Sequence, residues 1–426
     1  MGVLATAQAV GMALSLATTI ASARLMGPQA YGVAALLIAF PSLLWSFVGT
    51  KSMAVTTRYI ARLHSEGDGP RLGAICKLGF ALDLVASLAT FALVALTADW
   101  VTGQVLGLPG RGRDTIVYAA SLPLYSLTGT SGAILSSWGQ FRAIAVLQTA
   151  EKLLMLGAIV AVLAAGAGVT GYLFARASVQ AVTGVLMAVT ATRIVHRDHG
   201  SVWWTARLAT LGVIRRELTG FFGWNYVGVT FSGLLTQIPL MVLGRVRGPV
   251  EAGYFRLGTN LVSVGSSLEG ALARVTYPIL SQRWGTSERA ALRSTLRRWT
   301  LETGLPLALL MGGGVPLIPL VVPFVLGPQY AGMVLGTQLM MAGVVVSLLF
   351  FYVNVFYYAA GRVALWTKAY TGYALLLVVL AWPCAMAWGF LGVAGLVGVG
   401  EVIFTLAMVL LIDVRVSFAV TAVARA

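Results

Sequence analysis

Residues 368–412 read KAYTGYALLLVVLAWPCAMAWGFLGVAGLVGVGEVIFTLAMVLLI, and the only charged side chains among them are Lys368 and Glu401. A helix needs about 20 apolar residues to cross roughly 30 Å of hydrocarbon, because lipid offers its backbone no hydrogen-bond partners. This stretch is long enough for two such helices. A boundary near its middle is favoured by three glycines, Gly389, Gly392 and Gly395. We therefore predict two consecutive transmembrane spans, 368–389 and 391–412.

The composition places the whole chain in the same class. Of its 426 residues, 58% are hydrophobic and 10% are charged, with a mean hydropathy of +0.87, whereas soluble domains carry about 25% charged residues. So few charges cannot cover a soluble protein of this size, which excludes the soluble, disordered, collagen-like and disulfide-stapled classes. Cys76 and Cys384 both lie in apolar runs, and we interpret them as small hydrophobic residues rather than a disulfide or metal pair.

Apolar segments of spanning length recur along the whole chain. The predicted spans are 3–22, 33–50, 75–98, 115–136, 147–165, 169–192, 218–243, 254–273, 304–325, 334–358, 368–389 and 391–412. The chain is therefore predicted to be an all-α polytopic membrane protein with twelve transmembrane helices.

The basic residues give the chain an orientation. The net charge is +15, and most of the 29 lysines and arginines fall in alternate loops between the predicted spans. Loops rich in Lys and Arg stay on the cytoplasmic side, so both termini are predicted to be cytoplasmic. This placement favours an anionic membrane surface over nucleic acid as the reason for the charge, and no nucleic-acid partner is expected.

The two halves of the chain contain a similar motif. Arg24-Leu25-Met26-Gly27-Pro28 follows the first span, and Arg245-Val246-Arg247-Gly248-Pro249 follows the seventh, 221 residues later. Gly-Pro pairs also end helices without any repeat, but recurrence at the same topological position predicts two six-helix lobes, 1–212 and 213–426. Lobes with the same orientation imply a pseudo-twofold axis along the membrane normal, an architecture suited to alternating access.

Three segments carry a family resemblance: ASARLMGPQAYGVAALLIAFPSLLWSFVGTKSMAVTTRYIARLHSEGD (21–68), VLGRVRGPVEAGYFRLGTNLVSVGSSLEGALARVTYPILSQRW (242–284) and VLGPQYAGMVLGTQLM (325–340). They resemble the polysaccharide transporters, the O-antigen and exopolysaccharide flippases of the multidrug/oligosaccharidyl-lipid/polysaccharide exporter superfamily. The resemblance implies a MATE-like, two-lobed transporter with a central cavity in the bacterial inner membrane. It also implies a lipid-linked oligosaccharide substrate, commonly linked through undecaprenyl diphosphate.

The resemblance further suggests substrate-binding residues, because cationic side chains in the family's cavity are thought to receive the diphosphate. It carries over to Arg24 in ARLMGPQAYG, Arg58 in TTRYIA and Arg274 in ALARVTYPIL. Arg256 is a fourth candidate, although Arg24 and Arg256 are also suited to anchoring the outer interface. The chain departs from the family at Gln237, near which many relatives carry an aspartate, and this weakens any ion site carried over to the seventh span.

Charged residues within predicted spans are the other site candidates, because a charge at the centre of a bilayer costs roughly 2.5–3.5 kcal/mol and should face protein or water. Glu401 is nearest the middle of its span and is the first candidate for ion coupling, followed by Asp83 and Glu269. Structural alternatives remain open. Glu269 would pair with Arg274, Asp83 would bond a neighbouring helix, and Arg176 would extend toward the outer surface.

Helix breakers and a basic segment are further features. Pro41, Pro123, Pro239 and Pro383 interrupt predicted spans, and the ninth span, 304–325, contains Gly312-Gly313-Gly314 and four prolines. We predict a hinge in the ninth span, with a passive kink as the alternative. Arginines recur every four residues before that span, which predicts an interfacial helix or, alternatively, a docking site for a partner enzyme; they are Arg289, Arg293 and Arg297.

No catalytic motif, Walker motif or metal-ligand cluster occurs in the sequence, so no enzyme activity, no metal and no cofactor are predicted beyond coupling to H⁺ or Na⁺. Expected partners are the lipid-linked glycan, membrane lipids and glycan-assembly enzymes. The leading hypothesis is a flippase for lipid-linked oligosaccharide. Alternatives are a cation- or proton-coupled drug antiporter of the same superfamily, a membrane-embedded glycan polymerase, and a non-enzymatic scaffold.

Overall fold

The computed structural model describes residues 2–49, 52–200, 205–214, 233–285 and 289–423. These residues are almost entirely helical and no strand occurs among them, so the predicted all-α class is confirmed. The chain divides into two compact units, Met1–Gln237 and Ile238–Ala426. The predicted lobe boundary after residue 212 stays a prediction, since residues 215–232 lie outside the described part.

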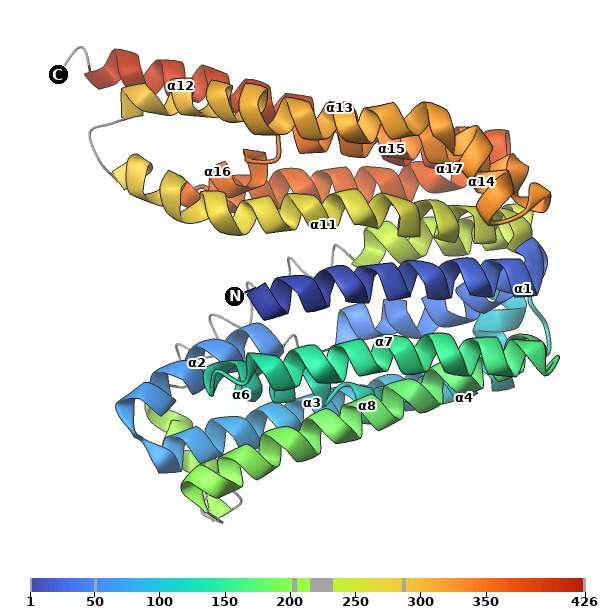
Figure 1. Cartoon of the computed structure of the whole chain (residues 1–426), viewed down its shortest axis with the longest axis horizontal. Coiled ribbons are helices and arrows are strands. Elements are labelled where there is room, and N and C mark those ends of the chain that lie inside the picture. Colours follow the sequence, from blue (N-terminus) through green and yellow to red (C-terminus); the bar gives the residue numbers. More distant parts are fainter. Residues whose placement is uncertain (1, 50–51, 201–204, 215–232, 286–288, 424–426) are drawn as a thin grey trace. The chain divides into compact units, whose positions relative to one another are not determined.

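The first unit is a bundle of long helices (Figure 1). Its elements are α1 (Gly2–Val48), α2 (Ser52–Glu66), α3 (Gly69–Trp100) with a π-helical turn (Val101–Val105), α4 (Gly112–Ala119), α5 (Leu122–Tyr125), α6 (Thr128–Ser137), α7 (Phe141–Ala164), α8 (Gly168–His199) and a 3₁₀ turn (Leu208–Ile214). Helices α1 and α7 lie side by side, as do α7 and α8.

Local sequence explains where α3 begins. Asp68 accepts a hydrogen bond from the backbone N–H of Arg71 at 3.1 Å, and Pro70 occupies the first turn, where its missing N–H costs nothing. Below this cap, Tyr59 and Ile60 of α2 are buried against Ile75 of α3. The short helix α2 is thereby packed onto the end of α3 rather than spanning a membrane by itself.

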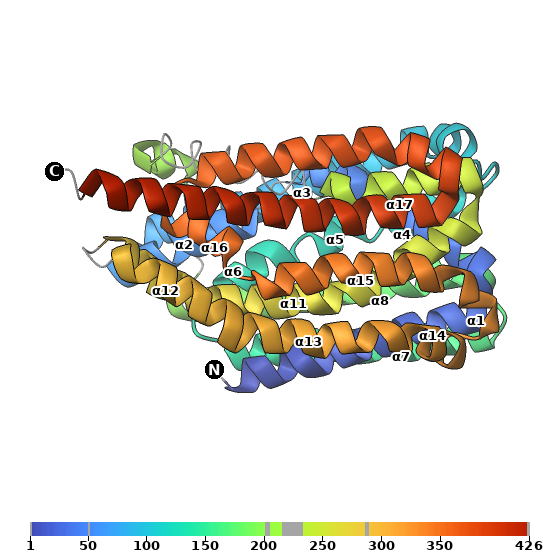
Figure 2. The ribbon, with the colours of Figure 1, turned by 90° about the horizontal axis from the view of Figure 1, so that it is seen from above.

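The second unit begins inside the helix formed by residues 233–247. Its other elements are α11 (Pro249–Gly285), α12 (Arg289–Trp299), a π-helical turn (Thr300–Gly304), α13 (Leu305–Gly314), a 3₁₀ turn (Val315–Leu317), α14 (Ile318–Val325), a 3₁₀ turn (Pro328–Met333), α15 (Val334–Leu349), α16 (Val353–Ala359) and α17 (Val363–Val423). Figure 2 shows α12 running on into α13, and α17 bending sharply partway along its length.

The twelve predicted spans fit these helices. Seven described helical stretches are individually long and apolar enough to cross a membrane, and two of them, α1 and α17, each contain two predicted spans. The three remaining spans are 115–136, divided among α4, α5 and α6; 218–243, described only from residue 233; and 254–273, which lies in the more polar α11. The multi-pass, twelve-helix fold is therefore confirmed.

The breaks in α1 and α17 occur at glycines and not at the prolines that we expected to interrupt them. Helix α1 kinks at Gly27 and continues through Pro41, and α17 kinks at Gly389 and continues through Pro383. A proline removes one hydrogen bond, which the rest of a long helix tolerates. The glycines instead have positive φ, which breaks the helical path outright. In the ninth span, 304–325, the breakers do end α13 at Gly314; the hinge there stays a prediction.

Turn geometry repeats between the two units. Four pairs of glycines with positive φ recur 220 to 222 residues apart: Gly27 (72°) with Gly248 (92°), Gly107 (69°) with Gly327 (109°), Gly139 (68°) with Gly361 (68°), and Gly168 (59°) with Gly389 (60°). The single sequence motif thus belongs to a repeat of turns that extends through both units. The twofold relation between the units stays a prediction.

Candidate functional site

Two of the predicted ion-coupling carboxylates come together inside the second unit. Glu269 lies on α11 and accepts a hydrogen bond from the hydroxyl of Ser347 on α15 at 3.0 Å. Glu401 lies on the second half of α17 and accepts one from the hydroxyl of Tyr373, on the first half, at 3.3 Å. The two carboxyls are close enough to interact electrostatically, and Tyr370 lies within the electrostatic reach of both. We call Glu269, Ser347, Tyr370, Tyr373 and Glu401 the acidic cluster.

Small residues bring the helices of the acidic cluster together. A Cβ at Gly343 of α15 would lie 2.8 Å from the carbonyl oxygen of Gly398 and 3.1 Å from the Cβ of Glu401. A Cβ at Gly398 would collide with the carbonyl of Leu339. The backbones of α15 and α17 therefore touch beside Glu401, as small residues allow in membrane bundles.

Aromatic residues neighbour Glu401, beginning with Tyr373, which donates to it. The ring of Tyr373 stacks on Phe404 with centroids 5.0 Å apart, and Tyr370 stacks on Trp366 at 6.3 Å. Among the residues that the structure describes, neither Glu269 nor Glu401 forms a salt bridge. Two carboxyls in an apolar lobe cannot both stay ionised at low cost without a cation. This arrangement is suited to holding a proton or a small monovalent cation.

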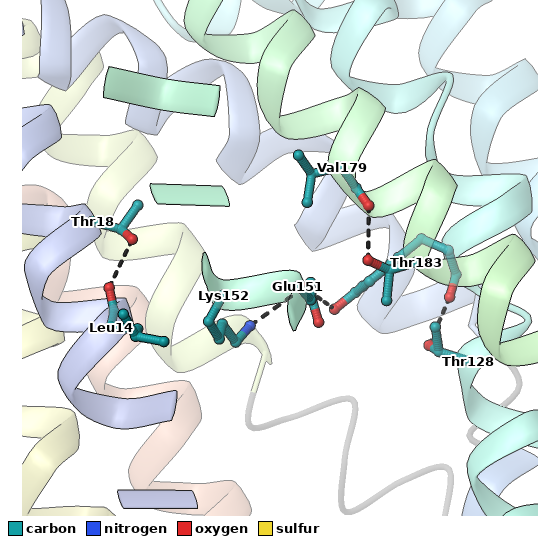
Figure 3. Close-up of polar contacts among 8 residues, drawn as sticks. Leu14, Thr18, Thr128, Glu151, Lys152, Val179 and Thr183 are labelled. Carbon is teal, nitrogen blue, oxygen red and sulfur yellow. Dashed lines mark hydrogen bonds and ion pairs between the residues drawn. The ribbon is translucent and has the colours of Figure 1, made fainter. Parts of the chain in front are cut away.

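A second polar cluster lies in the first unit, around a carboxylate that our sequence interpretation missed. Glu151 of α7 is only 6% exposed. It accepts a hydrogen bond from the hydroxyl of Tyr125 and pairs with the ammonium of Lys152, both at 3.4 Å. Figure 3 shows Glu151 and Lys152 on α7, opposite Thr183 of α8. Because α7 begins at Phe141 and not at 147, this pair lies well inside the helix. The sequence signal that could have found Glu151 is a carboxylate within an apolar run. The adjacent Lys152 makes the pair resemble part of a loop.

Arg176 of α8 lies near this cluster. Its guanidinium donates to the hydroxyl of Tyr172 at 3.5 Å, one turn toward the start of α8, while its Nε is buried without a hydrogen-bond partner among the described residues. The predicted extension of this side chain to the outer surface stays a prediction. Tyr118 is also within its reach, and Tyr125 interacts electrostatically with both Arg176 and Glu151. The first unit therefore pairs its buried carboxylate Glu151 with one cation, Lys152, whereas Glu269 and Glu401 form no salt bridge among the described residues.

The turn repeat relates the two clusters. Gln180 follows the Gly168 turn at the same distance as Glu401 follows the Gly389 turn. Gln180 accepts a hydrogen bond from the hydroxyl of Ser121 at 3.1 Å, with both residues buried. The equivalent position is therefore polar in both units but ionisable only in the second.

Asp83 is held by its neighbours, which confirms the structural alternative for this residue. Its Oδ2 accepts hydrogen bonds from the backbone N–H of Thr130 at 3.2 Å and from the hydroxyl of Thr130 at 2.7 Å. Thr130 lies in the first turn of α6, where a carboxylate satisfies free N–H groups and complements the helix dipole. Asp83 thus ties α3 to α6; a role in ion coupling stays a prediction.

The candidate substrate-binding arginines belong to both units, and those in the second unit do not share a site. Arg24 is exposed, three residues before the Gly27 kink, and the side chain of Arg58 lies outside the described part. Arg256 is half-buried and Arg274 is exposed, and both lie on α11, about 27 Å apart at roughly 1.5 Å per residue. Those two cannot hold one phosphate together. Arg274 donates to the carbonyl of Gly270 at 3.3 Å, and no pair with Glu269 forms.

Comparison with known proteins adds to this geometry. A family model described as polysaccharide biosynthesis protein matches residues 1–284. No curated protein sequence matches the chain. Among solved structures, the chain is similar to an inward-facing multidrug resistance MATE family transporter of the MOP superfamily, with a TM-score of 0.72, 14% identity and coverage of 97% of this chain and 98% of that one.

Two further structures are similar over nearly the full length. The lipid II flippase MurJ in an inward closed conformation gives a TM-score of 0.73 at 14% identity, covering 97% of this chain and 88% of that one. A mutant of the Vibrio cholerae MATE transporter VcmN gives 0.62 at 13% identity, covering 99% of each chain. At such identities the likeness establishes the fold and leaves the substrate open.

Proposed function

The chain belongs to the polysaccharide biosynthesis protein family, and from that premise we propose that it is a flippase that moves a lipid-linked oligosaccharide across the bacterial inner membrane by alternating access. The observation that carries the proposal is the family match over residues 1–284, combined with the fold of MOP-superfamily transporters over 97% of the chain. The family and the fold support transport rather than catalysis.

The proposed substrate carries a polyprenyl diphosphate, and arginine suits it chemically. The planar guanidinium donates two parallel hydrogen bonds to phosphate oxygens. Arg24 is exposed at the Gly27 turn and is the first candidate for this contact, with Arg58, Arg256 and Arg274 meeting the substrate elsewhere on its path. Both termini would be cytoplasmic. Association with glycan-assembly enzymes stays a prediction.

Translocation tests the substrate. Full-length protein in liposomes should move a fluorescent polyprenyl-diphosphate-linked sugar between leaflets, measured by protection from a membrane-impermeant quencher. Arg24→Gln should slow the movement by about tenfold or more, because a charge-assisted hydrogen bond contributes about 1.5–3 kcal/mol. The control is Arg113→Gln, which removes the same charge from another exposed site and should leave the rate within about twofold. No translocation by the wild type, while an active flippase works in the same vesicles, would contradict the proposal.

We also propose that Glu401, with Glu269 beside it, couples transport to H⁺ or Na⁺. The support is the acidic cluster, in which two carboxyls share an apolar lobe with hydroxyl and aromatic neighbours. Glu401→Gln keeps the shape and removes the ionisable group, so an imposed H⁺ or Na⁺ gradient should no longer accelerate transport. The exposed Glu66→Gln serves as the control. An unchanged gradient response in Glu401→Gln would exclude this role.

The acidic cluster also favours one alternative, a drug antiporter. Carboxyls beside aromatic faces attract organic cations as well as protons. An antiporter predicts that Glu401→Gln abolishes efflux of a cationic dye while Arg24→Ala leaves it unchanged. A flippase predicts instead that Arg24→Ala slows glycan translocation, and that Glu401→Gln removes only the acceleration by the ion gradient.

A further inference from the structure

The basic helix α12 is fixed to the second unit by its apolar side. Leu292 is 1% exposed and Leu296 is 6% exposed, both packed in a core with Phe351 and Phe356. Trp299, at the end of α12, lies 6.3 Å from the ring of Phe351. The helix is therefore held by its neighbours in one orientation and cannot roll about its axis.

The opposite side of α12 is basic and exposed. Its arginines are Arg293, Arg297 and Arg298, and we call them the arginine face. The Nε of Arg298 donates a hydrogen bond to the carboxylate of Glu302 at 2.8 Å, and both side chains are well exposed. Between Arg289 and Val325 the sequence has four arginines and one acidic residue, Glu302, so this stretch carries a net positive charge.

Exposed leucines follow the arginine face along the continuous helix that α12 and α13 form. Helix α12 passes through the π-helical turn into α13. Leu301 in the turn is 52% exposed, and Leu309 and Leu310 in α13 are 65% and 72% exposed. In a protein that spans a membrane, large apolar side chains exposed on a spanning helix face acyl chains. At about 1.5 Å per residue, Leu301 lies only about 5 Å along the axis from Arg298. The arginine face is thus fixed at the edge of the hydrocarbon, at the depth of headgroups.

We propose that the arginine face of α12 binds the phosphate groups of anionic lipids. Guanidinium groups bind phosphate oxygens through paired hydrogen bonds, and clustered basic residues beside a span are attracted to anionic leaflets. A water-soluble protein partner would not suit the surface as well, since the neighbouring leucines lie in hydrocarbon. The proposal does not depend on the transported substrate.

The test measures lipid retention by the full-length protein in neutral detergent. Native mass spectrometry compares phosphatidylglycerol with phosphatidylcholine of the same acyl chains. The wild type should retain phosphatidylglycerol preferentially, and the triple variant R293Q/R297Q/R298Q should weaken that binding by about a hundredfold, at roughly fivefold per arginine. Raising the salt concentration should weaken binding to the wild type and have little effect on the variant.

A matched variant and a soluble competitor complete the design. R111Q/R113Q/R245Q removes three exposed arginines from the predicted outer loops and should retain the wild-type preference. Unfolding temperatures should agree among the three proteins, because all six side chains are exposed. Retained binding in the α12 variant, or an equal loss in both variants, would overturn the proposal. So would binding of free glycerol phosphate as tightly as the lipid, which would indicate a phosphate site without a membrane component.

Discussion

At the scale of single residues, Asp83 is a buried carboxylate that joins two helices. Asp83→Ala would leave the N–H and hydroxyl of Thr130 without their acceptor inside the bundle. A buried donor left unpaired costs about 1–3 kcal/mol, so we expect a loss of this size in the free energy of unfolding. Asp83→Asn should cost less, because the amide oxygen still accepts.

Thermal unfolding of the purified protein in detergent measures this prediction. Glu66→Gln, which removes an exposed carboxylate paired with Arg62, is the control and should change stability by less than about 1 kcal/mol. If Asp83→Ala were as stable as this control, the bonds to Thr130 would contribute nothing and a role in transport would become the better account of Asp83.

At the scale of elements, Gly389 produces the bend in α17. Its φ of 60° and ψ of −139° are accessible almost only to glycine, and a Cβ there would press on the carboxylate of Glu251. Gly389→Ala should therefore destabilise the protein by about 1–3 kcal/mol. Gly313→Ala is the matched control, since that glycine is helical with open space around it; it should be neutral or stabilising by up to about 1 kcal/mol. Equal stability of the two variants would show that the bend is not strained by a side chain.

The same bend is held from α11 and from the helix before it. Glu251 accepts a hydrogen bond from the backbone N–H of Phe390 at 2.6 Å, and Arg247 donates to the carbonyls of Ala385 and Met386 at 2.9 and 2.6 Å. These side chains satisfy backbone groups that the broken helix leaves free. Glu251→Ala should expose the N–H of Phe390 and speed hydrogen exchange there, while exchange in α7 stays unchanged. Unaltered exchange at Phe390 would contradict this assignment.

At the scale of the whole molecule, the prediction concerns the orientation of the chain in the membrane. Charge placement predicts that the loop containing Arg113 is outside and that the end of α8 containing Arg197 is inside; both side chains are exposed. With Cys76 and Cys384 replaced by alanine, a membrane-impermeant maleimide should label Arg113→Cys in intact cells. Arg197→Cys should react only after permeabilisation. The reverse pattern would invert the predicted orientation and place both termini outside.

The sequence by itself determined the spans, the repeat and the family, because each depends on properties that are read along the chain. Spanning requires only enough consecutive apolar residues, and the offset between the two Arg-x-x-Gly-Pro motifs required no coordinates. It also singled out Glu269 and Glu401, because any charge in an apolar run is costly.

Tertiary structure alone decided which of these residues meet and what each one contacts. Glu269 and Glu401 stand far apart in the chain, and only close packing of α11, α15 and α17 around Gly343 and Gly398 brings them together. Burial of Glu151 and the bonds from Thr130 to Asp83 likewise depend on neighbouring helices. Local propensity and hydropathy are sums over adjacent residues, whereas a site is made by contacts between residues that are distant in sequence, and those contacts exist only once the helices have packed.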